Sequence, residues 1–542
     1  MTQSAHIDTF ARDNLPPRSQ WPEMRFDLPE LQYPERLNCG VELLDVNVRA
    51  KHGGRPAIVT PKESLTYAEL LERTDRIAHV IVDELGCVPG SRVLLRGPND
   101  ATMVAAWLAV MKAGCIAVTT MPLLRVKELT DVVGKARVRA AICQAGLAAD
   151  LETTKERCSD LERIVYYGDS GPTGNSLEAA MLAKPASFLA VDTAADDVCM
   201  IAFTSGTTGV PKGTMHFHRD VLAVCDTFSQ HVLRPDASDV FCGTPPLAFT
   251  YGLGGALLFP LRAGAAALQL EKTSPELLLD AIARYKATVC FTAPTMYRAL
   301  TPLVGNADIA SLKKCVSAGE ALPSATRAAW KDATGIDIID GIGSTEMLHI
   351  FIGASGDEIR AGSTGKAVPG YTACVLDDDG KRAKPGVVGR LAVKGPTGCR
   401  YLADERQKTY VVGGWNLTGD AYSMDEDGYF WYQARTDDMI VSAGNNIAGP
   451  EVEFALLAHA AVLECAVVGI PDDQRGMIVK AYVVLRESSQ ASPSMVKELQ
   501  DHVKATIAPY KYPRAMEFVS ALPRTATGKL QRFKLREETA SR

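Results

Sequence analysis

The stretch Thr204-Ser205-Gly206-Thr207-Thr208-Gly209-Val210-Pro211-Lys212-Gly213 decides the fold of this chain. It directly follows the apolar run Val198 to Phe203, a pattern that predicts a buried strand ending in a turn. The glycines let the backbone turn sharply, while the hydroxyls, N–H groups and Lys212 can surround and neutralise phosphate oxygens. The stretch does not match the Walker sequence G-x-x-x-x-G-K-[ST]. A flexible linker seldom follows an apolar strand directly, so we interpret the stretch as a different kind of phosphate-binding loop.

Short β-branched runs alternate with helical patterns on both sides of this loop. Arg92 to Leu95 predicts a strand, Ala101 to Lys112 a helix, and Ile116 to Thr119 the next strand. Alternation of this kind indicates α/β units with parallel sheets. Between about Gly365 and Tyr432 turn residues separate short strands such as Thr372 to Leu376, which suggests a small antiparallel barrel.

A second, smaller unit is expected after Arg435. There the pattern becomes α+β, with predicted helices at Pro450 to Ala458 and Ser494 to Thr506 and predicted strands at Cys465 to Gly469 and Lys480 to Leu485. A chain of 542 residues exceeds the size at which one hydrophobic core keeps growing, so at least two domains are expected. We place the boundary between residues 434 and 435.

Composition excludes several classes of function. A net charge of -6 argues against binding to nucleic acid or to an anionic membrane, because both need basic surface. The longest apolar stretches, Met103 to Val118 and Gly252 to Leu270, are interrupted and are interpreted as buried core. The 13 cysteines are scattered without a C-x-x-C pair, which favours reduced thiols in a cytoplasm over disulfides or a zinc site. His216 and His218 alone do not make a metal site.

Four further motifs carry chemistry, although each is a weak signal by itself. Asp340-Gly341-Ile342-Gly343-Ser344-Thr345-Glu346 follows a predicted strand, and its hydroxyl beside a carboxylate suits Mg²⁺. Thr418-Gly419-Asp420 is a tight turn that would aim a carboxylate at paired sugar hydroxyls. Arg435-Thr436-Asp437-Asp438 comes next, and Pro523-Arg524-Thr525-Ala526-Thr527-Gly528-Lys529 lies near the C-terminus.

Together with the loop at Thr204, these motifs resemble the adenylate-forming superfamily of acyl-CoA synthetases, peptide-synthetase adenylation domains and luciferases. They occur in the order and spacing of that superfamily, and the resemblance covers nearly the whole chain. It implies a large N-terminal AMP-binding domain (1–434) of two α/β subdomains plus a β-barrel near 365–432. It also implies a small, mobile α+β lid domain (435–542).

The resemblance implies a nucleotide site built from several segments. ATP would be bound at Thr204, Ser205, Gly206, Thr207, Thr208 and Lys212 (phosphates), at Gly319, Glu320, Ala321, Asp340, Gly341 and Ile342 (adenine), and at Asp420 and Arg435 (ribose). Thr345 and Glu346 would contact the α-phosphate and Mg²⁺, with Glu346 as the metal ligand. Lys529 would reach the substrate carboxylate and stabilise charge as pyrophosphate leaves.

For transfer to coenzyme A, the resemblance implies rotation of the lid domain about a hinge at Asp437. Ser442, Ala443 and Gly444 would line the pantetheine channel, and Lys511 and Arg514 would bind the nucleotide phosphates of CoA. Two residues depart from the pattern. Ala443 replaces the first Gly of the usual Ser-Gly-Gly, which could narrow the channel, and Ala434 replaces the Gly before Arg435.

An aromatic acid is the expected substrate. The acyl pocket would contain Phe249, Thr250, Tyr251, Gly343, His349 and Ile350. Phe249 to Gly252 lacks the Asp that pairs with an amino-acid ammonium group. Gly341 to Phe351 resembles benzoate-CoA ligases, whereas Ser4 to Asp13 and the stretch after Phe351 resemble 2-aminobenzoate-CoA ligases.

The expected function is an ATP-dependent, AMP-forming aryl-CoA ligase of the cytoplasm acting on 2-aminobenzoate or benzoate. Ligation of a short or medium aliphatic acid and loading of a separate carrier protein remain as alternatives. A luciferase-type oxygenase and a nucleotide sensor without catalysis are less consistent with the branch-level resemblance and with the joint presence of Glu346 and Lys529. Oligomeric state stays open, with a homodimer as one option.

Overall fold

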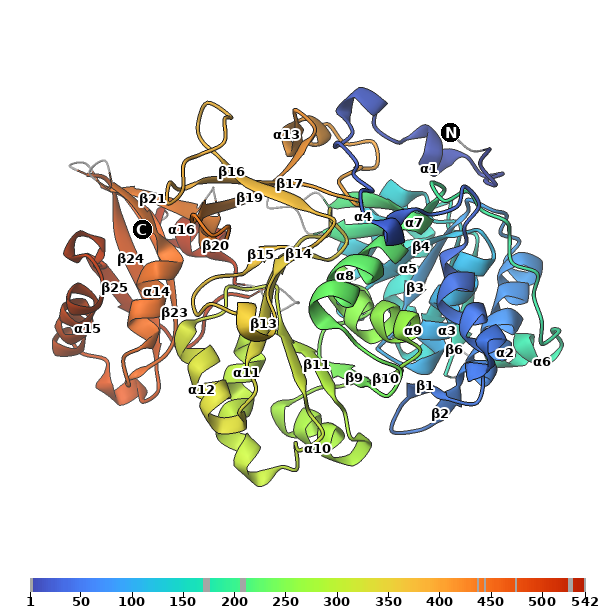
Figure 1. The fold of residues 1–542 in the computed structure, drawn as a ribbon, viewed down its shortest axis with the longest axis horizontal. Coiled ribbons are helices and arrows are strands. Elements are labelled where there is room, and N and C mark those ends of the chain that lie inside the picture. The colour runs from blue at the N-terminus through green and yellow to red at the C-terminus, as the bar shows by residue number, and fades with distance from the viewer. Residues whose placement is uncertain are drawn as a thin grey trace.

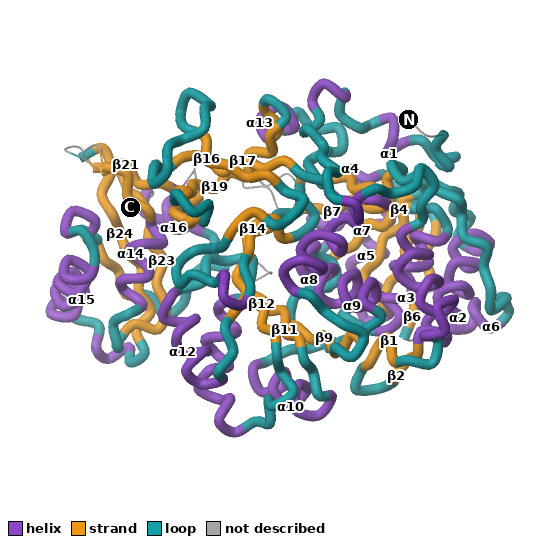
Figure 2. The backbone as a smooth tube through the Cα atoms, viewed as in Figure 1, coloured by secondary structure: helices purple, strands orange, loops and turns teal. Residues whose placement is uncertain are grey.

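Two parallel-stranded sheets with helices on their faces form most of the computed structural model (Figures 1 and 2). The structure describes residues 3–168, 176–204, 211–435, 438–442, 445–472, 475–524 and 530–540. The α/β alternation predicted from the sequence is confirmed, including the helix Ala101–Lys112 (α3) with the predicted bounds.

The first sheet carries the phosphate-loop stretch. Its order is β6-β5-β3-β4-β7-β8, all parallel except for β8. The strands are β3 (Arg92–Arg96), β4 (Ile116–Thr120), β5 (Ala140–Gln144), β6 (Arg163–Tyr167), β7 (Val198–Thr204) and β8 (Lys212–Phe217). The helices of this part are α1 (Phe10–Asp13), α2 (Tyr67–His79), α3, α4 (Val126–Ala136), α5 (Ala148–Arg157), α6 (Leu177–Leu182) and α7 (His218–Val224). All residues of β3 and β4 are buried, as expected for parallel strands covered on both faces.

The second sheet has the order β15-β14-β13-β12-β11-β9-β10-β1-β2. Its strands are β1 (Pro56–Val59), β2 (Ser64–Thr66), β9 (Val240–Gly243), β10 (Ala266–Leu268), β11 (Val289–Thr292), β12 (Lys314–Ser317), β13 (Ile338–Gly343), β14 (Ile350–Gly353) and β15 (Lys366–Ala367). Its helices are α8 (Thr250–Leu253), α9 (Phe259–Ala263), α10 (Pro275–Tyr285), α11 (Pro294–Leu300) and α12 (Ser324–Thr334). The parallel strands β9 to β13 end at one edge, the place where open α/β sheets bind ligands.

The segment predicted as a barrel is an antiparallel sheet. Its strands are β16 (Thr372–Leu376), β17 (Gly389–Lys394), β18 (Val411–Val412), β19 (Trp415–Met424) and β20 (Phe430–Arg435), with the short helix α13 (Gln407–Tyr410). The antiparallel pairing is confirmed: within the described residues the ladders run in the order β16-β17-β19-β18, with β20 beside β19. On its other side β20 is joined to the second sheet by a bridge between Phe430 and Gly365.

The C-terminal elements group at one end of the molecule, in orange and red in Figure 1. They are β21 (Met439–Ser442), β22 (Asn445–Ala448), α14 (Gly449–Leu457), β23 (Val462–Asp472), β24 (Gly476–Leu485), α15 (Pro493–Thr506), β25 (Ala515–Phe518) and α16 (Arg532–Ala540). These confirm the helices and strands predicted after Arg435. A separate apolar cluster lies under this sheet, between β23, β24, α14 and α15.

Ion pairs join the C-terminal elements to the larger part of the chain. Glu464 of β23 lies 3.4 Å from Arg298 of α11 and 3.2 Å from Arg524. Arg524 also lies 3.6 Å from Glu320, which follows β12. All 13 cysteines are free and buried. Within the described residues, no helix combines the length and apolar character needed to cross a membrane.

Candidate functional site

The phosphate-loop stretch connects the paired ends of β7 and β8, where Thr204 lies opposite Lys212. Ser205, Gly206, Thr207 and Thr208 lie outside the described residues. Lys135 anchors the base of the loop, because its Nζ donates to the Pro211 carbonyl at 3.2 Å and pairs with Asp404 at 2.6 Å. The Lys212 ammonium lies 5.4 Å from the centre of the Tyr401 ring. The loop base is therefore held at the carboxyl edge of the first sheet, next to Tyr401.

Tyr401 also contacts the candidate metal ligand. Its hydroxyl donates to Glu346 Oε1 at 2.5 Å, and both residues are almost fully buried. Glu346 lies in a turn after β13 that is closed by a hydrogen bond from the Met347 N–H to Ser344 Oγ. This one aromatic side chain thus links the base of the phosphate loop to the carboxylate predicted to meet Mg²⁺.

A buried polar network lies behind the same turn. His216 Nε2 is 2.8 Å from the Thr345 carbonyl oxygen, and its Nδ1 is 3.7 Å from Asp220. Asp220 pairs with Arg400 at 2.7 Å, and neither side chain is exposed at all. Burial raises the pKa of Asp220 and is the largest single influence on it, but Arg400, His216 and Arg219 together outweigh burial and hold that pKa well below its ordinary value. The network positions both the Thr345 backbone and, through the Arg400–Tyr401 segment, the Glu346 carboxylate.

Sequence reasoning missed this network. It concluded only that His216 and His218 alone do not make a metal site, and it did not consider Asp220, Arg400 or Tyr401 as site residues. The His216/Asp220 spacing at i, i+4 on neighbouring elements was a visible signal. The partner Arg400 lies 180 positions away along the chain, and no local pattern connects it to Asp220.

We expect Arg400→Met to destabilise the large domain by about 3–5 kcal/mol, because the substitution leaves the buried Asp220 carboxylate without its cation. The wild-type pair lowers the pKa of Asp220, so its contribution is present at neutral pH and is lost as the pH falls through the acidic range. Urea unfolding at pH 7 and at a pH well below the ordinary aspartate value of 3.8 measures this difference. Arg406→Met is the matched control, since Arg406 is also paired with a carboxylate but is partly exposed. Equal stability of Arg400→Met and wild type at pH 7 would contradict the expectation.

The predicted adenine residues come from the ends of two adjacent strands. Gly319, Glu320 and Ala321 follow β12, and Asp340, Gly341 and Ile342 lie in β13, where Asp340 is opposite Ser317. Gly319 has a φ of 90°, a conformation that favours glycine. Burial raises the pKa of Asp340 to about 7, against the opposing charge of Arg327. The fold therefore brings these two sequence segments to one edge.

The predicted ribose residues are neighbours on β19 and β20. Asp420 lies opposite Arg435 in the ladder, and Arg435 Nη1 donates to Asp420 Oδ1 at 3.1 Å. Gly419 has a φ of 79°, and a Cβ there would lie 2.7 Å from Arg435 Nη2. Burial raises the pKa of Asp420, with Arg435 opposing and Glu346 adding to the rise. The prediction of a tight turn is therefore wrong: Thr418, Gly419 and Asp420 lie within β19, where the register with β17 shifts and Arg435 approaches Gly419 closely.

An aromatic cluster surrounds the predicted acyl residues. His349 is 2% exposed. The centre of its ring lies 4.5 Å from that of Phe259, 5.5 Å from that of Phe228 and 5.7 Å from that of Tyr251. Burial lowers the pKa of His349 to about 3, so the imidazole is neutral at physiological pH. Among the described residues, neither ring nitrogen has a hydrogen-bond partner of ordinary length and angle. The backbone of Tyr251 is the polar group that approaches the ring.

Other acyl-pocket residues have structural contacts. The Tyr251 hydroxyl donates to the carbonyls of Val316 at 3.0 Å and Thr292 at 3.2 Å, so it braces the sheet edge. Phe249 precedes α8, Thr250 is buried in it, and Ile350 is buried at the start of β14. A Cβ at Gly343 would lie 2.6 Å from the His349 carbonyl oxygen.

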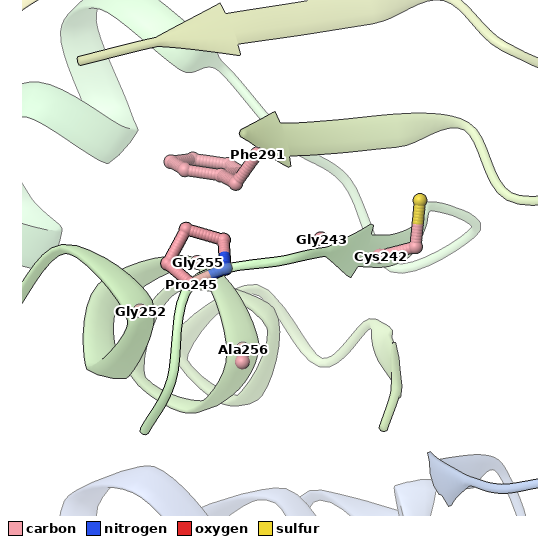
Figure 3. Close-up of a pocket in the computed structure, with 7 residues that line it drawn as sticks. All are labelled: Cys242, Gly243, Pro245, Gly252, Gly255, Ala256 and Phe291. Carbon is pink, nitrogen blue, oxygen red and sulfur yellow. The ribbon is translucent and has the colours of Figure 1, made fainter. Parts of the chain in front are cut away.

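Glycines let a helical segment pack directly on these rings. A Cβ at Gly254 would collide with the His349 imidazole, and one at Gly255 would lie 2.6 Å from the Phe291 ring. A cavity of about 10 Å³, enough for roughly one water, remains there. Figure 3 shows the Phe291 ring on one side of it and Pro245 with the helical turns of Gly252, Gly255 and Ala256 on the other. Among the described residues, Phe291 is the one aromatic residue that lines this space, which is too small to hold an aromatic ring.

The C-terminal candidates are partly described. Asp437, Ala443, Gly444 and Lys529 lie outside the described residues. Ser442 is buried at the end of β21. Lys511 pairs with Glu451 at 2.6 Å, and Arg514 lies over the Tyr512 ring at 4.7 Å. The charge of Lys511 is therefore already balanced by a carboxylate in this structure.

The residues that flank Lys529 lie near the nucleotide candidates. Arg524 and Leu530 pair as an antiparallel bridge, and Arg524 Nη1 is 3.6 Å from Glu320. Arg524, which precedes the undescribed residues 525–529, is thus held close to the loop after β12, and Leu530, which follows them, lies opposite Arg524.

Comparison with known families agrees with this geometry. A model described as "AMP-binding enzyme" matches residues 45–401, and one described as "AMP-binding enzyme C-terminal domain" matches residues 451–529. A benzoate--CoA ligase of Thauera aromatica is 36% identical over 517 residues, which are 94% of this chain and 97% of that protein.

Two solved structures are similar over nearly the whole chain. The anthranilate CoA ligase AuaEII in complex with anthranoyl-AMP has a TM-score of 0.90 and 35% identity, covering 95% of this chain and 99% of that one. A benzoate CoA ligase from Burkholderia xenovorans LB400 has a TM-score of 0.83 and 32% identity, covering 92% of this chain and 100% of that one.

Proposed function

This chain belongs to the AMP-binding enzyme family, and from that premise we propose that it is an ATP-dependent aryl-CoA ligase. It would adenylate an aromatic carboxylate and then transfer the acyl group to coenzyme A. The single observation that carries this proposal is the convergence of Lys212, Glu346 and Tyr401 at the sheet edge beside the aromatic cluster of His349. The names of the similar proteins support the choice of an aromatic acid.

In the first half-reaction a carboxylate oxygen attacks the α-phosphorus of ATP and pyrophosphate leaves. No side-chain nucleophile is needed, because positioning and neutralisation of charge can supply the rate. Lys212 and the loop from Thr204 would bind the β- and γ-phosphates, and Asp420 with Arg435 would hold the ribose. The ion pair between Arg524 and Glu320 supports a role for Lys529 at the carboxylate, since it anchors the neighbouring chain at this edge.

The residues at Glu346 fit a magnesium ion. The carboxylate is nearly buried, and the hydrogen bond that Oε1 accepts from Tyr401 leaves lone pairs for a hard cation. Thr345 and Glu346 would hold the ion, which would supply neutralisation of phosphate charge. The His216–Asp220–Arg400 network keeps the turn in place before any ligand arrives.

In the second half-reaction the thiol sulfur of coenzyme A attacks the carbonyl carbon of the adenylate, and AMP leaves. We propose domains at 1–434 and 435–542, with a hinge at Asp437 that turns Lys529 away and presents Ser442, Ala443 and Gly444. The C-terminal elements have their own apolar cluster beneath β23 and β24, which supports motion of the lid domain as one unit. Lys511 and Arg514 would bind CoA phosphates only after Lys511 leaves Glu451. We also propose a cytoplasmic location, with which 13 free cysteines are consistent. The proposed role is in the breakdown of aromatic acids.

Within the aromatic acids we propose 2-aminobenzoate over benzoate. The neutral His349 imidazole offers one donor and one acceptor, and among the described residues the Tyr251 backbone is the polar group that approaches them, without ordinary hydrogen-bond geometry. A substrate with an ortho amino group can add a hydrogen bond there, whereas benzoate cannot, a difference of about 1–3 kcal/mol. The anthranoyl-AMP in the similar AuaEII structure points in the same direction.

The His349→Phe variant is expected to lose about 10- to 100-fold in kcat/KM for 2-aminobenzoate, because the ring keeps its packing but loses both nitrogens. Turnover of benzoate should change only a few-fold. Ile350→Val, a conservative change in the adjacent core residue, serves as the control and should change kcat/KM for both substrates by the same factor. A parallel loss for both acids in His349→Phe would contradict recognition of the amino group.

A substrate screen tests the function itself. Purified protein with Mg²⁺ and ATP is given benzoates, aliphatic acids and amino acids, and pyrophosphate release is measured with and without CoA. We expect release with the aromatic acids and a CoA thioester as product. Turnover restricted to aliphatic acids, or acyl transfer to a carrier protein but not to CoA, would refute the aryl-CoA ligase proposal.

A further inference from the structure

Two thiols and an imidazole from three separate elements meet in the protein interior. Cys39 lies just before the π-helical turn Val41–Asp45, Cys199 lies in β7, and His218 is the first residue of α7. One candidate ligand atom from each residue lies within 4.8 Å of the other two, and all three residues have no exposed surface. Sequence analysis found nothing near His218 to complete a metal site, because the two cysteines come from distant segments.

The contacts within this cluster are direct. His218 Nδ1 lies 3.1 Å from Cys39 Sγ and accepts a hydrogen bond from the Cys39 N–H at 3.2 Å. His218 Nε2 is buried and has no hydrogen-bond partner among the described residues. Burial of this imidazole costs free energy, because one of its two nitrogens has no hydrogen-bond partner among the described residues.

Other close thiol pairs in the chain lack the third donor. Cys87 lies beside Cys115, and Cys242 lies opposite Cys290 on the neighbouring strand, but no imidazole or carboxylate joins either pair among the described residues. The Cys39/Cys199/His218 cluster is the one group of three or more potential metal ligands found in that part of the chain. The histidine, and not the proximity of two thiols, distinguishes this cluster from the other thiol pairs.

The donor set selects a class of ion. Thiolate sulfur and imidazole nitrogen are ligands of soft and borderline cations, and the set contains no carboxylate that would suit Mg²⁺ or Ca²⁺. Three donors shielded from solvent match a three-coordinate Cu⁺, or a Zn²⁺ that keeps one water. We propose that Cys39, Cys199 and His218 form a binding site for a thiophilic d¹⁰ cation, Cu⁺ or Zn²⁺.

Binding would form bonds from the metal to the two sulfurs and one nitrogen and release the thiol protons to solvent. The ion would connect the N-terminal segment at Cys39 to β7, the strand that ends at Thr204 and leads into the phosphate loop. This site lies outside the residues assigned to ligation, so it is independent of the proposed function and is tested by metal content, not by turnover.

The experiment uses the full chain, reduced and stripped of metal. Zn²⁺ is titrated against a chromophoric chelator, and Cu⁺ is titrated anaerobically against bicinchoninate. One equivalent of Zn²⁺ or Cu⁺ should bind per wild-type chain, and Cys199→Ser and His218→Gln should bind it at least about 100-fold more weakly. Cys87→Ser, which removes a buried thiol of a pair without histidine, is the matched control and should bind like wild type.

Circular dichroism first establishes that each variant is folded. If Cys199→Ser does not fold, alkylation of the wild type in moderate urea decides the question, since bound metal should slow modification of Cys39 and Cys199 but not of Cys87. Absence of a stoichiometric site, equal binding by all variants, or equal alkylation rates with and without metal would overturn the proposal. A Cys39–Cys199 disulfide in place of metal uptake would overturn it as well.

Discussion

Lys529→Ala is expected to lower the adenylation rate by about 10²- to 10³-fold while leaving thioester formation from a supplied aroyl-adenylate nearly intact. The ammonium group would stabilise negative charge that develops between carboxylate and α-phosphate, and loss of one such preorganised group costs roughly 2.7–4 kcal/mol. The second half-reaction does not develop charge at that position. Pyrophosphate exchange measures the first step, and CoA-dependent consumption of synthetic 2-aminobenzoyl-AMP measures the second.

The chain offers a matched control for this experiment. Lys534, in α16, is exposed and close in sequence, and Lys534→Ala should leave both steps unchanged. The two half-reactions separate the lid hypothesis from a general loss of folding. Adenylation preserved in Lys529→Ala, with thioester formation abolished, would reverse the assignment and refute the proposed two-state use of the lid domain.

Glu346→Gln is expected to slow adenylation by about 10²- to 10³-fold and to raise the Mg²⁺ concentration needed for half-maximal rate. The amide has the shape of the carboxylate and can still accept the hydrogen bond from Tyr401, so the substitution removes charge without removing packing. The readout is the pyrophosphate-exchange rate across a Mg²⁺ titration.

Tyr401→Phe provides the comparison, because it removes only the hydrogen bond to Glu346 Oε1 and leaves the carboxylate charged. It should cost roughly 10-fold, in line with one hydrogen bond to a charged group. The Mg²⁺ dependence should move far less in Tyr401→Phe than in Glu346→Gln. Identical Mg²⁺ titrations for wild type and Glu346→Gln would exclude Glu346 as the metal ligand.

Local rules explain why much of the fold was predictable. Helix α3 matches its predicted bounds because Asp100 caps its N-terminus by accepting from the Met103 N–H and because its apolar run is buried on all sides. Helix α15 is similarly capped, by Ser492. The antiparallel strands β16 and β17 followed from turn residues, but closure of a barrel depends on contacts between strand edges, and local pattern does not encode those contacts.

The candidate site was predictable to the extent that its residues lie in contiguous motifs. Asp420 and Arg435 were identified from separate motifs, and the ladder between β19 and β20 pairs them. Lys511 was expected to be available for CoA, yet it is paired with Glu451, a contact between α14 and the turn after α15 that has no local signature. Such pairings depend on how helices pack, so spacing along the chain is silent about them.

By itself, the sequence determined the alternation of strands and helices, the position of the phosphate loop after an apolar strand, and the chemistry available in each motif, because these follow from side chains within a few residues of one another. Only the tertiary structure decided that Arg400 neutralises Asp220 behind Thr345, that the His349 imidazole is buried among four aromatic rings, and that Cys39 and Cys199 meet at His218. Each of these is a contact between distant segments, created when apolar burial brings the elements together and their polar groups must find partners inside.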